Sequence, residues 1–193
     1  MSGVLGVGGL VGSGGAVANC YASGPVSGKT EVGGLVGSGS RVTDCCSTGA
    51  VSGESSVGGL VGRSYNWVAN CYSTGAVSGK SSVGGLVGGN SSLLTNCYSA
   101  GRVSGTGQYV GGLVGRSDPT VVGCFWDIQT SGQAGSAAGT GKTTPEMQTA
   151  KTFLEAGWDF VGETKNGTAD IWWILEGKDY PRLGWEIGDE ASP

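Results

Sequence analysis

The sequence predicts an all-β fold, a right-handed parallel β-helix (β-solenoid) of about five coils, followed by a small α+β capping segment. Glycine accounts for 41 of the 193 residues and charged side chains for only 13%, unlike the composition of an ordinary globular domain. The hexapeptide Val-Gly-Gly-Leu-Val-Gly recurs at intervals of 25, 25, 26 and 27 residues, beginning at Val7, Val32, Val57, Val83 and Val110. Such self-similarity is typical of solenoids, in which each repeat stacks on the next.

Two further landmarks recur with the hexapeptide. A cysteine follows each copy, at Cys20, Cys45, Cys71, Cys97 and Cys124. The tripeptide Val-Ser-Gly follows the first four of these cysteines, beginning at Val26, Val51, Val77 and Val103. The differences in repeat length fall in two variable loops between the landmarks, as expected for stacked coils whose corners protrude.

Each repeat contains only short, β-branched apolar stretches, and no helical 3.6-residue pattern occurs in residues 1–124. A repeat this short cannot bury its own apolar face, so it must stack on its copies. Parallel, in-register stacking would place equivalent residues about 4.8 Å apart, with valine on valine and cysteine on cysteine. Parallel crossovers are almost always right-handed, which sets the expected hand of the coil.

The residue before each cysteine is expected to turn a corner. Val17 and Cys20 are three positions apart, so both can face the interior only if the chain bends between them. The corner residues are Asn19, Asp44, Asn70, Asn96 and Gly123. These residue types tolerate the left-handed backbone conformation that a corner needs. We expect the Val-Gly-Gly glycines to form another corner and the stacked asparagines to hydrogen-bond with one another.

Composition changes near residue 126, which indicates three regions. We expect a solenoid over residues 1–126, a flexible Gly/Ser-rich linker over residues 127–142, and a C-terminal cap over residues 143–193. Residues 125–193 carry five of the six tryptophans. We expect a helix from Thr143 or Thr144 to about Glu155, and then two extended Trp-rich segments. A solenoid end exposes apolar side chains and unpaired backbone, which an aromatic segment could cover.

The repeats resemble the GLUG motif of bacterial surface and secreted proteins, through the tetrapeptides Gly9–Gly12, Gly34–Gly37, Gly59–Gly62, Gly85–Gly88 and Gly112–Gly115. The resemblance covers roughly residues 4–126 and implies an adhesin-like β-solenoid outside a bacterial cell. This family occurs in adhesin-like and filamentous-haemagglutinin-like proteins and beside IgA-specific peptidase domains. It implies no catalytic residue here, because the chemistry of such proteins lies in other domains. No signal peptide precedes the first repeat, so we expect a fragment of a longer protein.

The equivalent cysteines are expected to form a buried, reduced structural ladder of Cys20, Cys45, Cys71, Cys97 and Cys124. Stacked β-carbons lie farther apart than the roughly 3.5–4.5 Å that a disulfide prefers. Cys46 occupies the position that an aromatic ring fills in other repeats, so we expect its thiol to be exposed. Because the chain has no histidine and no Cys-x-x-Cys pair, we expect no metal and no cofactor.

The first variable loop is the best candidate for a ligand or partner contact. Its side chains lie along one edge of the expected solenoid, and they are Arg41, Arg63, Tyr65, Trp67 and Arg116. The rings that follow the cysteines are a second candidate, as a stacking platform for sugars, and they are Tyr21, Tyr72, Tyr98 and Phe125. For these rings, ordinary aromatic packing or coverage by the C-terminal segment is the favoured interpretation.

The composition narrows the possible functions. The absence of histidine removes Ser–His and Cys–His nucleophile pairs. A net charge of −4 without a basic cluster argues against nucleic-acid binding. The sequence has no run of 18 apolar residues, so we expect no membrane insertion. The repeat region has four acids at non-equivalent positions, which disfavours polysaccharide hydrolysis: Glu31, Asp44, Glu54 and Asp118.

We therefore expect a non-catalytic, extracellular structural or interaction module, an adhesin-like stalk or scaffold that contacts a surface glycan or a protein. Two alternatives stay open. One is a fibre subunit that self-assembles by end-to-end stacking of solenoids. The other is a carbohydrate-binding or polysaccharide-processing β-helix.

Overall fold

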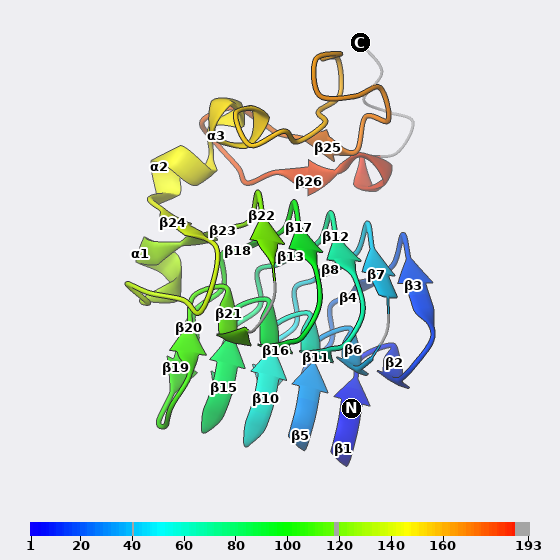
Figure 1. The fold of residues 1–193 in the computed structure, drawn as a ribbon, viewed down its shortest axis with the longest axis vertical. Helices are drawn as coiled ribbons and strands as arrows, with labels where there is room; N and C mark the ends of the chain where they lie inside the picture. The colour runs from blue at the N-terminus through cyan, green and yellow to red at the C-terminus, as the bar shows by residue number, and fades with distance from the viewer. Residues whose placement is uncertain (40, 118–119, 188–193) are drawn as a thin grey trace.

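The computed structural model describes residues 1–39, 41–117 and 120–187 and shows a parallel β-solenoid of about five coils (Figure 1). Four sheets run along its axis. Sheet 1 contains β1 (Ser2–Gly8), β5 (Val26–Gly33), β9 (Val51–Ser52), β10 (Ser55–Gly58), β14 (Val77–Gly79), β15 (Ser81–Gly84), β19 (Val103–Gly105) and β20 (Val110–Gly111). Sheet 2 contains β2 (Val11–Ser13), β6 (Val36–Ser38), β11 (Val61–Ser64), β16 (Val87–Asn90) and β21 (Val114–Ser117).

The other two long sheets flank the corner that precedes each cysteine, sheet 3 before it and sheet 4 after it. Sheet 3 contains β3 (Ala16–Ala18), β7 (Arg41–Thr43), β12 (Val68–Ala69), β17 (Leu94–Thr95) and β22 (Val121–Val122). Sheet 4 contains β4 (Tyr21–Ala22), β8 (Cys46–Ser47), β13 (Tyr72–Ser73), β18 (Tyr98–Ser99), β23 (Phe125–Asp127) and β24 (Thr140–Lys142). The remaining strands, β25 (Trp172–Trp173) and β26 (Arg182–Leu183), pair antiparallel outside the solenoid.

The strands of the four long sheets are parallel, and equivalent residues of successive coils stand opposite one another. The first valine of the hexapeptide forms a column in sheet 1, which contains Val7, Val32, Val57, Val83 and Val110. The second valine forms a column in sheet 2, which contains Val11, Val36, Val61, Val87 and Val114. The predicted stacking of like residues is therefore confirmed.

Glycines divide the interior of each coil into two cores. The Leu, Val and Cys columns of sheets 2 and 3 pack in one core, and the valines of sheet 1 pack in the other. At the boundary between the two cores, a β-carbon added to Gly58 on β10 would lie 2.1 Å from the carbonyl oxygen of Val61 on β11. β10 and β11 approach this closely only because glycine lacks a side chain. The Val-Gly-Gly glycines thus permit a close approach of two strands. The chain also bends at each of these glycine pairs, between sheet 1 and sheet 2, so the expected corner is present, although none of these glycines is left-handed.

Two left-handed corners occur in each coil. The predicted corner before each cysteine is confirmed, because its residues have φ between 50° and 58°: Asn19, Asp44, Asn70, Asn96 and Gly123. A second corner, which the sequence did not reveal, precedes each hexapeptide at Gly6, Glu31, Ser56, Ser82 and Tyr109, with φ between 52° and 64°. Of the expected side-chain bonds between stacked corner residues, the described residues show Asn70 donating to Asp44 at 3.0 Å.

Four of the ladder cysteines, Cys45, Cys71, Cys97 and Cys124, are buried in the core as expected, whereas Cys20 of the first coil is only partly buried beside it. All five thiols are free. Each thiol bends back across its corner toward the carbonyl oxygen two residues earlier, as in the contacts of Cys71 with Ala69 at 3.0 Å and of Cys97 with Thr95 at 3.1 Å. Burial raises the pKa of the Cys97 thiol, which keeps the proton that this contact uses. Cysteine therefore fills core volume and also bonds the corner that it follows.

Residues 126–142 cover the end of the last coil, where a flexible linker was expected. The segment contains α1 (Ile128–Ser131) and then β24, which extends sheet 4 by pairing with β23. Gln133 donates its side-chain amide to the carbonyl of Val103 in sheet 1, and the backbone of Ala137 donates to Val114 in sheet 2. The Trp126 side chain packs in the core that contains the Leu, Val and Cys columns of sheets 2 and 3. The segment is held because these contacts satisfy the exposed edges of three sheets.

The C-terminal segment lies along one side of the solenoid, beside sheet 4, whereas it was expected to cap the end (Figure 1). It contains α2 (Thr144–Met147), α3 (Ala150–Leu154), β25, β26 and the 3₁₀ helix η1 (Gly184–Glu186). The single expected helix is broken at Thr149, which is extended. The break coincides with a crossing loop, because Glu176 accepts a hydrogen bond from the backbone of Ala150 and Gly177 donates to Gln148.

Candidate functional site

The predicted edge residues are exposed, and the structure sorts them into arginine–ring pairs. Arg41, on β7, holds its guanidinium carbon 5.1 Å from the centre of the Trp67 ring. Arg63, on β11, lies 5.0 Å from the ring of Tyr65 in the following loop. Both rings stay accessible, since Trp67 is 39% exposed and Tyr65 is 53% exposed. Such cation–π contacts orient the arginine heads while leaving them in solvent.

Arg116 pairs with a ring that the sequence analysis did not single out. Its guanidinium carbon lies 5.6 Å from the centre of the Tyr109 ring, which is half exposed. Tyr109 occupies the second left-handed corner, where other coils have glycine, glutamate or serine. The sequence feature that could have indicated Tyr109 is the loop before Val110, which is one residue longer than in the other coils. Extra residues at solenoid corners often make binding contacts.

A hollow lies between Arg63 and Arg116, and we call it the Gly89 hollow. Strand register places Arg63, Gly89 and Arg116 side by side on β11, β16 and β21. Glycine in the middle leaves a volume of about 270 Å³, lined by serine and asparagine side chains from the same coils. A β-carbon at Gly89 would meet its nearest neighbour, in Arg63, at 3.6 Å. The backbone at this position could therefore carry a side chain, and the hollow is open because residue 89 is glycine.

The ring column is mostly covered, so it offers no platform for sugars. Tyr72 and Tyr98 stack with ring centres 5.1 Å apart and are at most 5% exposed. Phe125 is also buried, and Tyr21 of the first coil is 67% exposed. Coverage by the C-terminal segment, the favoured interpretation for these rings, is what the structure shows for three of the four.

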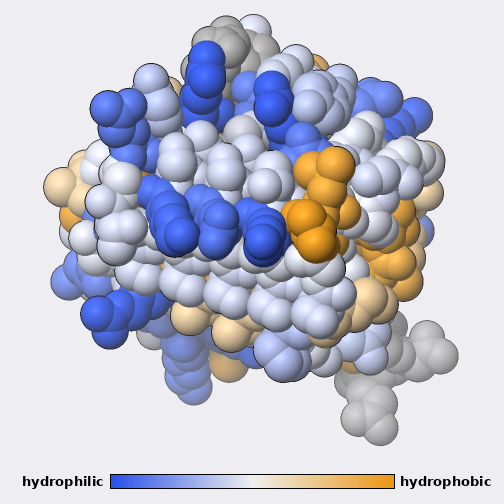
Figure 2. Space-filling model, turned by 90° about the horizontal axis from the view of Figure 1, so that it is seen from below, coloured by the Kyte–Doolittle hydropathy of each residue, from blue (hydrophilic) through white to orange (hydrophobic). Residues whose placement is uncertain are grey.

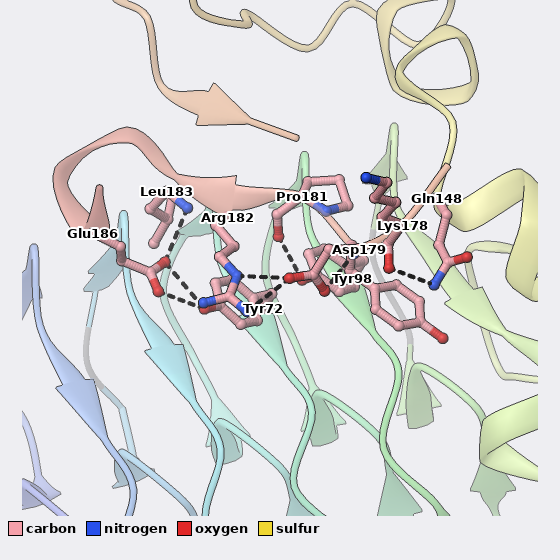
Figure 3. Close-up of polar contacts among 10 residues, drawn as sticks. Tyr72, Tyr98, Gln148, Lys178, Asp179, Pro181, Arg182, Leu183 and Glu186 are labelled. Carbon is pink, nitrogen blue, oxygen red and sulfur yellow. Dashed lines mark hydrogen bonds and ion pairs between the residues drawn. The ribbon is translucent and has the colours of Figure 1, made fainter. Parts of the chain in front are cut away.

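Polar contacts fasten the C-terminal segment to these rings (Figure 3). The Tyr72 hydroxyl donates to the carboxylate of Glu186 at 2.7 Å, and the Tyr98 hydroxyl donates to the carbonyl of Pro181 at 2.6 Å. Burial and the neighbouring Tyr98 and Glu186 raise the pKa of Tyr72 well above its usual range. The phenol therefore stays protonated and remains a donor to the carboxylate.

The expectation that Cys46 has an exposed thiol is wrong. Cys46 is 3% exposed, because the C-terminal segment packs over its position in sheet 4. Burial, and then the charge of Glu186, raise the pKa of the Cys46 thiol to about 12. A thiol in this environment is an inert apolar side chain and not a nucleophile.

The acids of the repeat region are separated from one another. Glu31 accepts a long hydrogen bond from Tyr65 at 3.4 Å, Asp44 binds Asn70, and Glu54 pairs with Lys80 at 3.2 Å. Asp118 lies outside the described residues. Within residues 1–39, 41–117 and 120–187, no three His, Cys, Asp or Glu side chains gather to hold a metal ion. The described acids that line a cavity in pairs all include a residue of the C-terminal segment: Glu146 with Glu155, Asp179 with Glu186, and Asp44 with Asp170.

Comparison with known families matches the centre of the chain. Residues 53–78 and residues 79–104, two successive coils, each match the family described as the GLUG motif. The chain carries GLUG repeats. The register of the solenoid extends the GLUG coil beyond the matched pair, because all five hexapeptides occupy equivalent positions in sheets 1 and 2.

Similar proteins are longer than this GLUG-repeat chain. A protein of Evansella cellulosilytica described as a "Putative Gly-rich membrane protein" is 41% identical over an alignment of 77 residues, and the match covers 37% of this chain and 8% of that protein. A solved structure, described as "a putative immunoglobulin A1 protease from Bacteroides ovatus", superposes with a TM-score of 0.65 at 21% identity. The superposition covers 94% of this chain and 64% of the other, and it shows a shared fold. None of the described helices is long and apolar enough to cross a bilayer.

Proposed function

We propose that this chain is a non-catalytic structural and interaction module of a bacterial surface protein, a stiff scaffold that presents one edge to a partner. The observation that carries the proposal is that five coils share one backbone path, while the side chains that vary gather along the loop edge. A constant stack with variable corners is how solenoids display binding residues. The membrane-protein description of the E. cellulosilytica relative supports a place at the cell surface.

Fibre assembly by end-to-end stacking is less well supported than a monomeric scaffold. The first coil does offer an open end: β1, β2, β3 and β4 each have a described partner on one side, and Met1, Val4, Leu5 and Leu10 are at least half exposed. Figure 2 shows an apolar cluster of this kind at one end of a row of hydrophilic residues. The opposite end is covered by residues 126–142, however, and head-to-tail stacking requires both ends.

One set of measurements separates the scaffold from its alternatives. We expect the chain to sediment as a monomer across micromolar concentrations, to scatter X-rays as one rigid body, and to release no reducing ends from a panel of plant and bacterial polysaccharides. Filaments that grow with concentration would favour the fibre subunit. Release of reducing ends that is lost in Glu31→Gln or Glu54→Gln would favour a polysaccharide-processing enzyme and contradict the scaffold.

A further inference from the structure

The Gly89 hollow carries positive charge without an acid to neutralise it among the described residues. Arg63 and Arg116 are exposed, and neither forms an ion pair with a described carboxylate. Two described acids lie near this edge and are already engaged: Glu31 accepts a hydrogen bond from the hydroxyl of Tyr65, and Glu54 pairs with Lys80. Residues 1–124 carry six basic and four acidic side chains, whereas residues 125–193 carry five and eleven. The repeat region is thus the basic part of an acidic chain.

The two charges are held apart. Arg63 and Arg116 stand on strands separated by the strand of Gly89, which places their α-carbons about 9.6 Å apart, or two strand spacings. Each guanidinium lies over its own ring, Tyr65 or Tyr109, so the two heads do not converge on one point. This geometry suits two acidic groups on one extended ligand better than a single small anion.

The floor of the hollow supplies hydroxyl groups. Ser55, Ser56, Ser81 and Ser82 line it, beside the Gly89 backbone. The Ser56 hydroxyl would lie 3.7 Å from a β-carbon at Gly89, and no described residue hydrogen-bonds to it. Hydroxyls that donate and accept, together with half-exposed tyrosine rings, are the groups that recognise a hydroxyl-rich ligand. Arginine recognises carboxylate and sulfate groups through paired N–H donors.

We infer that the Gly89 hollow binds an acidic glycan, a sugar chain bearing sulfate or carboxylate groups spaced to meet Arg63 and Arg116. The inference rests on the proposed function, because it names the ligand class of the scaffold. One sugar unit occupies the hollow above Gly89 and the serines, and its acidic neighbours reach the two guanidinium groups. A volume of about 270 Å³ is slightly below the roughly 300–1,000 Å³ of sites that hold a whole small molecule. It therefore suits one sugar unit of a longer chain.

Fluorescence anisotropy with labelled tetrasaccharides tests the inference on the full chain. A sulfated heparin fragment and an oligogalacturonate provide the sulfate and carboxylate sources, and cellotetraose provides a neutral sugar. We expect one or both acidic tetrasaccharides to bind at low salt, more weakly as salt rises, and cellotetraose not to bind. Arg63→Gln and Arg116→Gln should each weaken binding about tenfold, as expected for a lost charge-assisted hydrogen bond.

Two controls separate a built site from general attraction. Gly89→Leu fills the hollow while keeping both arginines, in a strand whose backbone accepts a side chain, and it should abolish binding. Arg102→Gln removes an exposed arginine that lies outside the Gly89 hollow and should leave binding unchanged. Circular dichroism of each variant confirms that the fold is kept.

Binding of cellotetraose as tight as that of the acidic sugars would overturn the inference, as would unchanged binding by Gly89→Leu or no binding of either acidic sugar. Such failures would leave the scaffold proposal standing if the chain is still monomeric, rigid and without hydrolytic activity. The scaffold proposal fails separately, through filaments or through release of reducing ends.

Discussion

The glycine after the first hexapeptide valine sets the cross-section of each coil. At Gly33, Gly58 and Gly84 an added β-carbon would stand 2.0–2.1 Å from a carbonyl oxygen of the facing strand. Overlap this severe cannot be relieved by a rotamer change, because the opposing atom belongs to the backbone. The same glycines also separate the two cores, so the whole stack depends on them.

Gly58→Ala should therefore destabilise the protein by at least about 3 kcal/mol, or prevent folding. Gly89→Ala is the matched control, because a β-carbon there meets only ordinary contacts. We expect the control to change the free energy of unfolding by less than about 1 kcal/mol. Urea denaturation followed by circular dichroism compares the two variants, and equal stabilities would contradict the steric account.

Residue chemistry made one corner of the coil predictable and left the other hidden. Asparagine and aspartate before each cysteine favour a left-handed backbone, and Asn70 and Asp44 adopt it. At the second corner, Glu31 and Tyr109 have no such preference, so the neighbouring coils impose the conformation. The same lack of a local signal hid the pairing of Tyr109 with Arg116.

At the scale of elements, the C-terminal segment and sheet 4 share one aromatic core. Trp172 is fully buried against Tyr98, with ring centres 6.1 Å apart, and against Trp158 at 4.4 Å. The concentration of tryptophan in this segment led us to expect that it covers exposed apolar surface of the solenoid. The sequence could not say that the covered surface is the side of the solenoid, because residues 126–142 already fill the end. The pairing of β24 with β23 and the bond of Ala137 to Val114 run through the backbone, which leaves little trace in residue type.

Trp172→Ala should cost about 3–5 kcal/mol, as for other fully buried tryptophans. Trp172→Phe should cost much less, because it keeps a ring and removes an indole N–H that has no partner among the described residues. We expect Cys46 to react with a thiol reagent at pH 8 faster in the alanine variant than in the wild type, because loosening the segment exposes it. Mass spectrometry of the labelled peptide measures the reaction. Equal reactivity of Cys46 in the two proteins would contradict the view that the Trp172 packing keeps this thiol covered.

Alkaline pH should weaken the same interface. The pKa of Cys46 rises from 9.0 to about 12 through burial, and that of Tyr180 rises from 10.0 to about 12 through burial and its bond to Asp127. Above about pH 9 the unfolded chain releases protons that the folded chain keeps, so the free energy of unfolding should fall progressively toward pH 12. Urea titrations at pH 8, 9.5 and 11 measure the decline. It should be shallower in Cys46→Ala, and a stability that stays constant over this range would contradict the assigned shifts.

At the scale of the whole molecule, repetition made the architecture predictable. Equal spacing of valine, cysteine and glycine through residues 1–124 indicates columns, and columns require parallel strands in register. The candidate site was predicted only in part. Arg63 and Arg116 were expected in the first variable loop along one edge, and the structure places them on that edge within β11 and β21. The hollow between them depends on Gly89, one glycine among 41. Only strand register shows that this glycine stands between two arginines.

The parallel stacking of equivalent residues is tested most directly by nuclear Overhauser contacts in uniformly labelled protein. The structure predicts amide-to-Hα contacts that connect Val57 with both Val32 and Val83, with the same pattern repeated for the second valine column. Strong Hα-to-Hα contacts between these segments, the signature of antiparallel pairing, or contacts that pair valine with glycine in a shifted register, would contradict the solenoid.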